Sequence, residues 1–133
     1  MKDWDTPFTP ALGIVRALDV ALDLIEKDGM EKRWKRAEEL GDWTRKQLKG
    51  IGLELYSRAP SATVSAACVP AGVDGSRLVK VMRDEKGVTL AGGQGELTGK
   101  IVRIAHMGSI TREDLECGIQ ILKETIQELS GKK

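Results

Sequence analysis

One arginine stands at the centre of an otherwise apolar run near the C-terminus. Arg103 lies between Ile101 and Ala105, in a segment whose pattern predicts a strand. A guanidinium keeps its charge, and its planar donors fit both oxygens of a carboxylate. Placing that charge among aliphatic neighbours costs free energy unless it is paired. Its partner is therefore an acidic group of the chain itself, the carboxylate of a ligand or, at a strand edge, water.

The segment before this strand is rich in glycine. Gly92, Gly93, Gly95 and Gly99 fall within eight residues. A stretch without side chains lets a ligand approach the backbone closely. This neighbourhood favours a ligand as the partner of Arg103.

The same segment superficially matches two phosphate-binding patterns and fails both. For a P-loop, the first glycine of the pattern would have to stand at Gln94, so the glycines beside it are one residue out of register, and Ile101 replaces the serine or threonine that holds magnesium. For the dinucleotide fingerprint, Thr98 replaces the third glycine. Both mechanisms need a helix N-terminus aimed at phosphate, whereas a strand is predicted here. We expect no nucleotide site.

The remaining side chains predict no catalytic or metal centre. His106 is the only histidine, and a single histidine after a strand is typical of a structural role. It is not accompanied by a Ser-His-Asp set, a metal-ligand cluster or a close carboxylate pair. Cys68 and Cys117 are too few for a zinc site or a disulfide framework. Both lie in apolar segments, which indicates reduced core thiols.

The first predicted helix is bounded by residues typical of helix ends. Thr9 is a good N-cap, Pro10 suits the first helical position, and Gly29 suits the position after the end. The polar residues between them form one narrow stripe, whereas a surface helix normally has a broad polar face. We therefore expect this helix to be covered on more than one side.

The rest of the chain predicts a small α+β domain. A second helix is expected from about residue 30 to 49, with Trp34 and Trp43 serving packing rather than binding. Asp74 or Ser76 caps a short helix, and the sequence that begins at Thr111 caps the last one. Strand-like segments lie at 53–56, 62–69, 88–92 and 101–106. We predict a small antiparallel or mixed sheet covered by helices.

Composition places the chain among ordinary globular proteins. Its 133 residues are 41% hydrophobic and 31% charged, with a net charge of +1. That balance argues against a nucleic-acid partner or an anionic membrane surface. No apolar run approaches the ~20 residues of a membrane span, and the first residues lack the apolar region of a signal peptide. We expect a cytoplasmic protein.

Several separated motifs together resemble one family. The stretch GGQGELTGKIVRIAHMG is similar to the C-terminal signature of class V aminotransferases, in particular the alanine–glyoxylate and serine–pyruvate branch. FTPALGIVRALDVALDLIEKDGMEKRWKR, VPAGVDGSRLVKVM and SITREDLECGI resemble further landmarks of the same family, in the same order. The resemblance covers nearly the whole chain. It implies the small C-terminal domain of a fold-type I enzyme that depends on pyridoxal 5'-phosphate and forms a homodimer with active sites at the subunit interface.

The resemblance also implies roles for individual residues. Arg103 matches the arginine that binds the α-carboxylate of the substrate, and Gly92 and Gly93 match glycines near the substrate mouth. Thr9 matches a threonine that reaches the cofactor phosphate of the partner subunit. Thr6 stands where the family often has a tyrosine with a similar role.

The family's catalytic lysine and its pyridine-facing aspartate belong to the large domain, which precedes the matched region. Lys49 and Lys86 each precede a glycine, as the catalytic lysine does, but both fall at predicted helix ends, where glycine is a C-cap. We therefore expect no catalytic residue in this chain. The expected organisation is a connecting segment and long helix at 1–29 and a small domain at 30–133, with the catalytic large domain absent.

The expected function is the C-terminal portion of an aminotransferase. The full-length enzyme would move an amino group from a small amino acid, such as alanine or serine, to a 2-oxo acid, such as glyoxylate or pyruvate. This portion alone would be inactive and would not retain pyridoxal phosphate. Its expected partners are the missing large domain, a second subunit and the substrate. Two alternatives remain: a free-standing α+β binding module, and a small subunit of a split enzyme.

Overall fold

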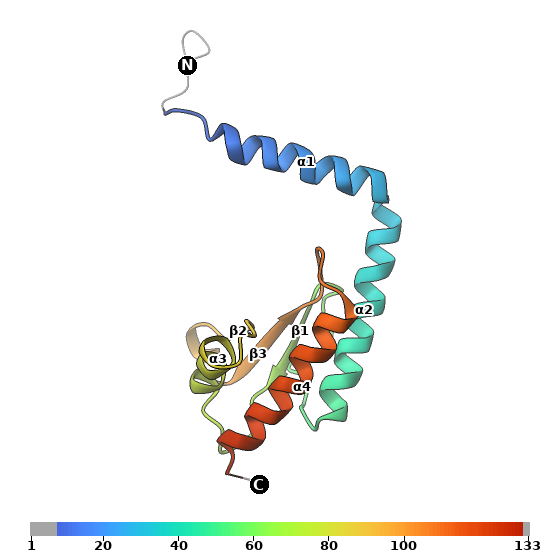
Figure 1. Cartoon of the computed structure of the whole chain (residues 1–133). Coiled ribbons are helices and arrows are strands. Elements are labelled where there is room, and N and C mark those ends of the chain that lie inside the picture. Colours follow the sequence, from blue (N-terminus) through green and yellow to red (C-terminus); the bar gives the residue numbers. More distant parts are fainter. Residues whose placement is uncertain (1–7, 132–133) are drawn as a thin grey trace. The chain divides into compact units, whose positions relative to one another are not determined.

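The computed structural model describes residues 8–131 and divides the chain into two compact units (Figure 1). The first unit ends at Lys35 and the second begins at Arg36. Helix α1, Leu12–Asp28, belongs to the first unit. Most of helix α2, Met30–Gly50, and all later elements belong to the second.

Helix α1 ends as predicted and begins later than predicted. Gly29 follows its last residue with a φ of 84°, a conformation that favours glycine. The N-cap, however, is Ala11 and makes no side-chain bond, so the expectation that Thr9 caps the helix is wrong. The reason is a turn before the helix, in which the Leu12 amide donates to the carbonyl of Pro10 at 2.8 Å.

Helix α1 buries none of its residues. Seven of its large apolar side chains are at least 47% exposed, from Val20 at that value to Ile14 at 74%, and Ile25 is half-buried. Within the first unit, the described residues supply none of the cover that the apolar pattern predicts.

The second unit contains a three-stranded antiparallel sheet in the order β1-β3-β2. Its strands are β1, Val64–Cys68, β2, Ala91–Gly92, and β3, Ile101–Ala105. The expected strand at 53–56 contributes only one bridge, from Leu55 to Ala67. The expected strand at 88–92 pairs over its last two residues alone.

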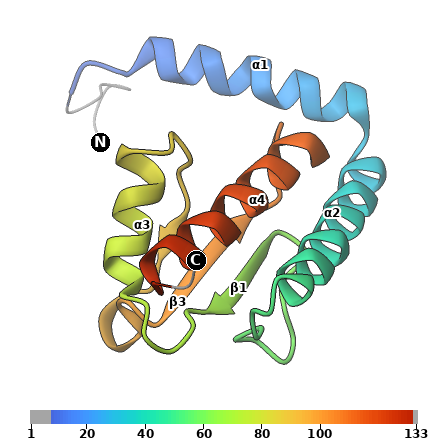
Figure 2. The same cartoon turned by 60° about the horizontal axis from the view of Figure 1, so that its bottom comes forward.

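Helices cover one face of this sheet. Helix α3, Gly75–Asp84, and helix α4, Arg112–Leu129, pack side by side against it, and Figure 2 shows α4 in front of β3 with α3 to its left. The core on this face is built from residues of the helices and of strands β1 and β3: Leu48, Leu53, Ala67, Leu78, Met82, Val102, Ile119 and Leu122. The predicted α+β class, with a small sheet covered by helices, is confirmed.

The predicted caps of the later helices are also confirmed. Asp74 accepts hydrogen bonds from two backbone amides at the start of α3. Thr111 and Asp114 form a complete capping box at the start of α4. These local signals are readable because each joins residues only two or three apart in the sequence.

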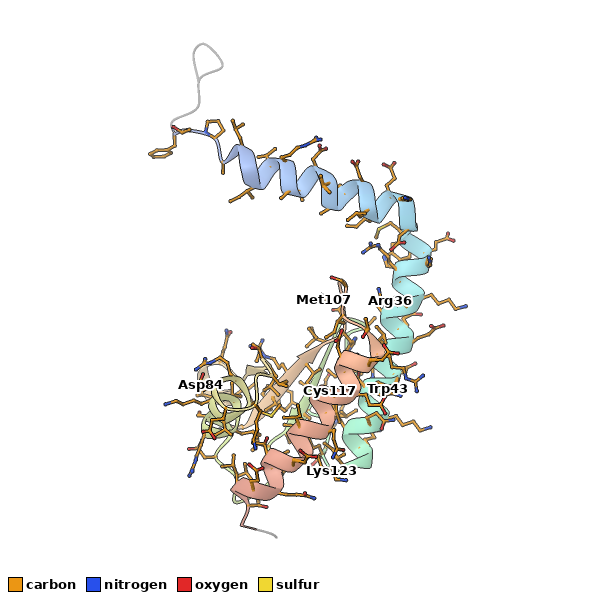
Figure 3. The ribbon with its side chains drawn as sticks, viewed as in Figure 1. Arg36, Trp43, Asp84, Met107, Cys117 and Lys123 are labelled. Atoms are coloured by element: carbon orange, nitrogen blue, oxygen red, sulfur yellow. The ribbon has the colours of Figure 1, made fainter. Side chains whose placement is uncertain are left out.

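Two side-chain expectations fail on the surface. Cys117 lies on the outer side of α4 and is exposed, so it is not a core thiol (Figure 3). Trp43 packs against the core and carries Arg112 over its ring at 4.9 Å, whereas Trp34 is 60% exposed. The packing role therefore holds for Trp43, and the described residues provide no cover for Trp34.

Candidate functional site

The face of the sheet away from the helices carries small side chains around a single arginine. Strand alternation and the pairing register place seven residues on this face: Val64, Ala66, Cys68, Ala91, Ile101, Arg103 and Ala105. Of the seven only Ile101 is buried, whereas Ser65, Ala67 and Val102 are buried on the opposite face. The result is a shallow, largely apolar surface from which one guanidinium projects.

Arg103 is tethered at one nitrogen and free at the other two. Its Nε donates to the carbonyl of Gly92 at 2.9 Å. Within the described residues it forms no ion pair, and neither terminal nitrogen has a hydrogen-bond partner. The internal salt bridge is therefore excluded for residues 8–131. The tether fixes the plane of the group and leaves its two outer donors available to a carboxylate.

The glycines beside Arg103 are required by the loop's own packing. A Cβ on Gly93 would lie 1.9 Å from the carbonyl oxygen of Leu97. A Cβ on Gly75 would lie 2.3 Å from the carbonyl oxygen of Gly99. The close approach that the sequence suggested for a ligand is thus, at Gly93, an approach of the loop to itself. Gly92 contributes differently, through the carbonyl that holds Arg103.

The backbone after the glycines does not form a phosphate loop. A short 3₁₀ turn, Gly95–Leu97, leads into β3 at Ile101. A strand offers no cluster of free backbone amides of the kind that a helix N-terminus presents to phosphate. The predicted strand after the glycines is confirmed. Among the described residues, no group of three or more histidine, cysteine or acidic side chains could hold a metal ion.

His106 directly follows β3, the strand that carries Arg103, and it is fully buried on the helix side. Its Nε2 lies 3.0 Å from the hydroxyl of Ser65, and its Nδ1 has no hydrogen-bond partner within the described chain. Burial lowers the pKa of the imidazole, and the positive charge of Arg45 lowers it further. The lowered pKa favours the neutral form of the ring, and the structural role of His106 stays a prediction.

Two residues of α2 make room for this imidazole, and the sequence alone did not identify them. A Cβ on Gly41 would lie 2.7 Å from Cε1 of His106. Arg45 donates to the carbonyl of Ser61 at 3.1 Å and pairs with Asp42 at 2.7 Å. A glycine inside a long polar helix was the available signal, because glycine there costs helix stability unless packing requires it.

Neither rejected lysine has the environment of a catalytic amine. Lys86 bonds Glu128 at 2.9 Å, and that hydrogen bond raises the pKa of the lysine. Lys49 is exposed near the end of α2. Thr9 is exposed in the first unit, and Thr6 lies outside the described residues. The structure thus brings Arg103 and Gly92 together and leaves Thr9 in a separate unit.

Comparisons with known proteins give one consistent result. No protein-family model matches the chain. An uncharacterized aminotransferase of Methanocaldococcus jannaschii is 38% identical over 126 residues, which cover 93% of this chain and 33% of that protein. The alanine–glyoxylate aminotransferase of Felis catus is 33% identical over 129 residues, covering 94% of this chain and 31% of the relative.

Solved structures agree with the sequence matches. The crystal structure of an alanine–glyoxylate aminotransferase from Nostoc sp. superposes with a TM-score of 0.85 at 28% identity, covering 94% of this chain and 34% of that one. The chain therefore spans about a third of the length of the relatives it matches. In sequence and in fold, this chain matches the C-terminal third of class V aminotransferases of the alanine–glyoxylate and serine–glyoxylate type.

Proposed function

We propose that this chain supplies the substrate-carboxylate site of a pyridoxal-phosphate-dependent aminotransferase that acts on a small amino acid and a 2-oxo acid. The observation that supports it is the state of Arg103, whose Nε is bonded to Gly92 while its two terminal nitrogens have no partner among the described residues. A charge of this kind on an apolar surface calls for an anion.

The surroundings of Arg103 suit a small monocarboxylate. The neighbouring positions on its face are Ala66 across β1 and Ala91 across β2, both too short to cover the guanidinium. An apolar surface also excludes water once a second wall closes over it, which strengthens a charge-assisted hydrogen bond. Arg103 would hold the carboxylate common to the amino acid and the 2-oxo acid, and so orient either substrate. Gly92 and Gly93 would border the same site.

The cofactor would be held mostly by residues outside this chain. Here Thr9 offers an exposed hydroxyl just before α1, suited to a phosphate oxygen, and Thr6 is proposed for a similar contact. Pyridoxal phosphate, when bound, accepts the electrons released at the α-carbon. The chain's own contribution is to bind and orient. Alone it would be inactive, because in the family that it resembles the catalytic lysine belongs to the large domain, which precedes the matched third.

The assembly proposed is a homodimer of the longer protein. The exposed apolar surface of α1 supports this, because such a helix needs more cover than one domain face supplies. Cys68 and Cys117 are both free, as is usual in a reducing cytoplasm. No helix in the described part of the chain is both long and apolar enough to cross a membrane.

The test joins these 133 residues to the preceding two thirds of the Methanocaldococcus jannaschii relative and measures transamination of alanine, serine and glyoxylate. Arg103→Gln should raise KM for the amino acid by roughly 30- to 1000-fold, corresponding to about 2–4 kcal/mol for a desolvated charge pair. Arg77→Gln, on the exposed side of α3, is the matched control and should leave KM unchanged. An unchanged KM for Arg103→Gln would remove this residue from the proposed role.

A further inference from the structure

The sheet opens into a pocket where β2 and β3 separate. The register pairs Gly92 with Val102 and Ala91 with Arg103, so the next pairs in the ladder would be Leu90 with Ile104 and then Thr89 with Ala105. Neither pair forms, and no backbone hydrogen bond joins residues 88–90 to β3 within the described chain. We call the resulting space the wedge pocket.

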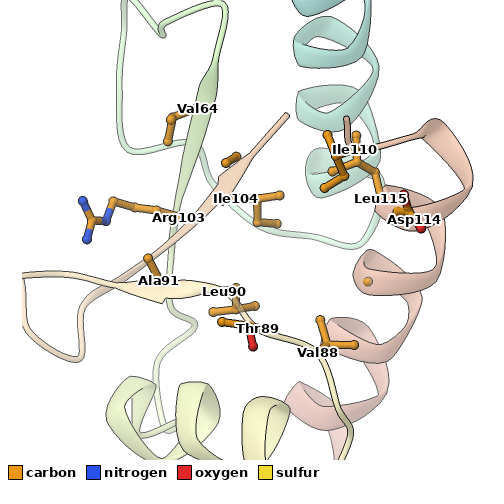
Figure 4. Close-up of a pocket in the computed structure, with 12 residues that line it drawn as sticks. Val64, Val88, Thr89, Leu90, Ala91, Arg103, Ile104, Ile110, Asp114 and Leu115 are labelled. Carbon is orange, nitrogen blue, oxygen red and sulfur yellow. The ribbon is translucent and has the colours of Figure 1, made fainter. Parts of the chain in front are cut away.

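The wedge pocket is apolar and of substantial size. Its volume is about 380 Å³. Leu90 and Ile104 line it from the two separating strands, and Ile110, Leu115 and Gly118 line it from α4 and the turn before it. Arg103 also lines the pocket, and Figure 4 shows its guanidinium directed away from Leu90 and Ile104. The apolar space between Leu90 and Ile104 is therefore not where the guanidinium itself would bind a carboxylate.

Unpaired backbone groups border the wedge pocket. Hydrogen bonds in an antiparallel ladder alternate, and the bond from the Gly93 amide to the Ile101 carbonyl at 3.1 Å sets the phase on this side of β3. Ala105 therefore turns its N–H and C=O toward the opening, as Thr89 would across from it. Both residues are exposed. A chain segment in extended conformation would bond such groups, whereas an apolar small molecule would not.

From these observations we infer that the wedge pocket receives an extended segment with an apolar side chain from the part of the protein that precedes the matched third. This inference rests on the proposed function, because only the longer protein supplies the segment. The relatives carry about two thirds of their length outside the region matched here. The apolar side chain would lie between Leu90 and Ile104, and its backbone would bond Ala105.

Hydrogen exchange at one amide tests the backbone half of the inference. The Ala105 amide should exchange at least ~10-fold more slowly in the joined protein described above than in the 133-residue chain, because it gains a partner. The amide of Val102, which lies in the middle of β3 in both proteins, is the internal control. Equal exchange of Ala105 in both proteins would overturn the inference.

Filling the pocket tests the side-chain half of the inference, because the resulting change in Tm should have opposite signs in the 133-residue chain and in the joined protein. A Cβ on Gly118 would make an ordinary contact with Val88 at 3.7 Å, so a larger side chain there can enter the wedge pocket. Compared with Gly118→Ala, Gly118→Leu should raise Tm of the 133-residue chain, because it fills an empty space. In the joined protein it should lower Tm, because it competes with the incoming segment. A rise in both proteins would contradict the inference.

The two proposals fail separately. If the joined protein transaminates and Arg103→Gln raises KM while Ala105 stays unprotected, the wedge-pocket segment is wrong and the function stands. If Ala105 is protected and Gly118→Leu lowers Tm while no amino transfer occurs, the segment is right and the function is wrong.

Discussion

The imidazole of His106 and the hydroxyl of Ser65 share a hydrogen bond of 3.0 Å between β3 and β1, two residues separated by 41 positions in the sequence. Both are buried beneath α2, and Arg45 of that helix reaches the same hydroxyl at 3.5 Å. Arg103 stands three residues earlier, on the strand that His106 directly follows. The stability of this polar cluster therefore bears on the strand that presents the guanidinium.

The cluster predicts a loss of stability in mild acid. The pKa of His106 is lowered in the folded chain, by burial first and by Arg45 second, whereas the unfolded value is about 6.5. Below that unfolded value the unfolded chain binds a proton that the folded chain does not. The stabilisation is thus fully present above pH ~6.5 and is lost as pH falls toward the folded pKa. Denaturation midpoints measured between pH 7.5 and 5 should fall accordingly.

A variant isolates this histidine from the acidic groups. His106→Gln keeps a hydrogen-bonding side chain without a titration in this range, so its stability should change much less between pH 7.5 and 5. Asp114 and Glu113 have pKa values lowered by hydrogen bonds at the start of α4, and their contribution is lost only at lower pH. A parallel decline in the variant would show that His106 is not the source.

A single methyl group on α2 should disturb the same cluster. Gly41→Ala places a Cβ 2.7 Å from Cε1 of His106, so the ring or the helix must shift. We expect a cost of about 1–3 kcal/mol in the free energy of unfolding, as for overpacked cores. Gly50→Ala, at the end of the same helix with nothing within 4 Å, is the control and should be nearly neutral. Urea denaturation of both variants decides the comparison.

The two neighbouring glycines before β3 should differ sharply. Gly93→Ala places a Cβ 1.9 Å from a backbone oxygen of Leu97, which only a movement of the loop can relieve. Gly92→Ala meets nothing closer than Val79 at 3.5 Å. Gly93→Ala should therefore lower Tm and broaden the amide signals of residues 93–100, while Gly92→Ala leaves both nearly unchanged. Equal tolerance of the two would mean that the loop is not packed as described.

Local rules predicted most of the fold and the place of Arg103. Helix periodicity, the capping box at Thr111 and the apolar run around Arg103 each involve residues close in sequence, so composition and spacing suffice to identify them. The resemblance then indicated a role for Arg103, and the structure shows a guanidinium in a state suited to that role.

What the sequence did not predict depends on contacts between distant residues. The fit of Gly41 against His106 joins residues from α2 and the end of β3, and no local pattern specifies it. The wedge pocket depends on where β2 stops pairing, although residues 88–90 have the composition of a strand. Cys117 was misplaced because an apolar neighbourhood in sequence includes both faces of a helix.

The exposed surface of α1 predicts that the 133-residue chain associates with itself or binds an apolar dye. Leu18 and Leu22 are 58% and 54% exposed on a helix that buries nothing, and contiguous apolar area of this kind drives association in water. The double variant Leu18→Gln, Leu22→Gln should lower the apparent mass in light scattering at high concentration and reduce dye fluorescence. Lys27→Gln, in the polar stripe of the same helix, should change neither. If the unmodified chain stays monomeric and binds no dye, α1 is covered in solution by other residues of the chain. That result would favour a free-standing binding module over a portion of a larger enzyme.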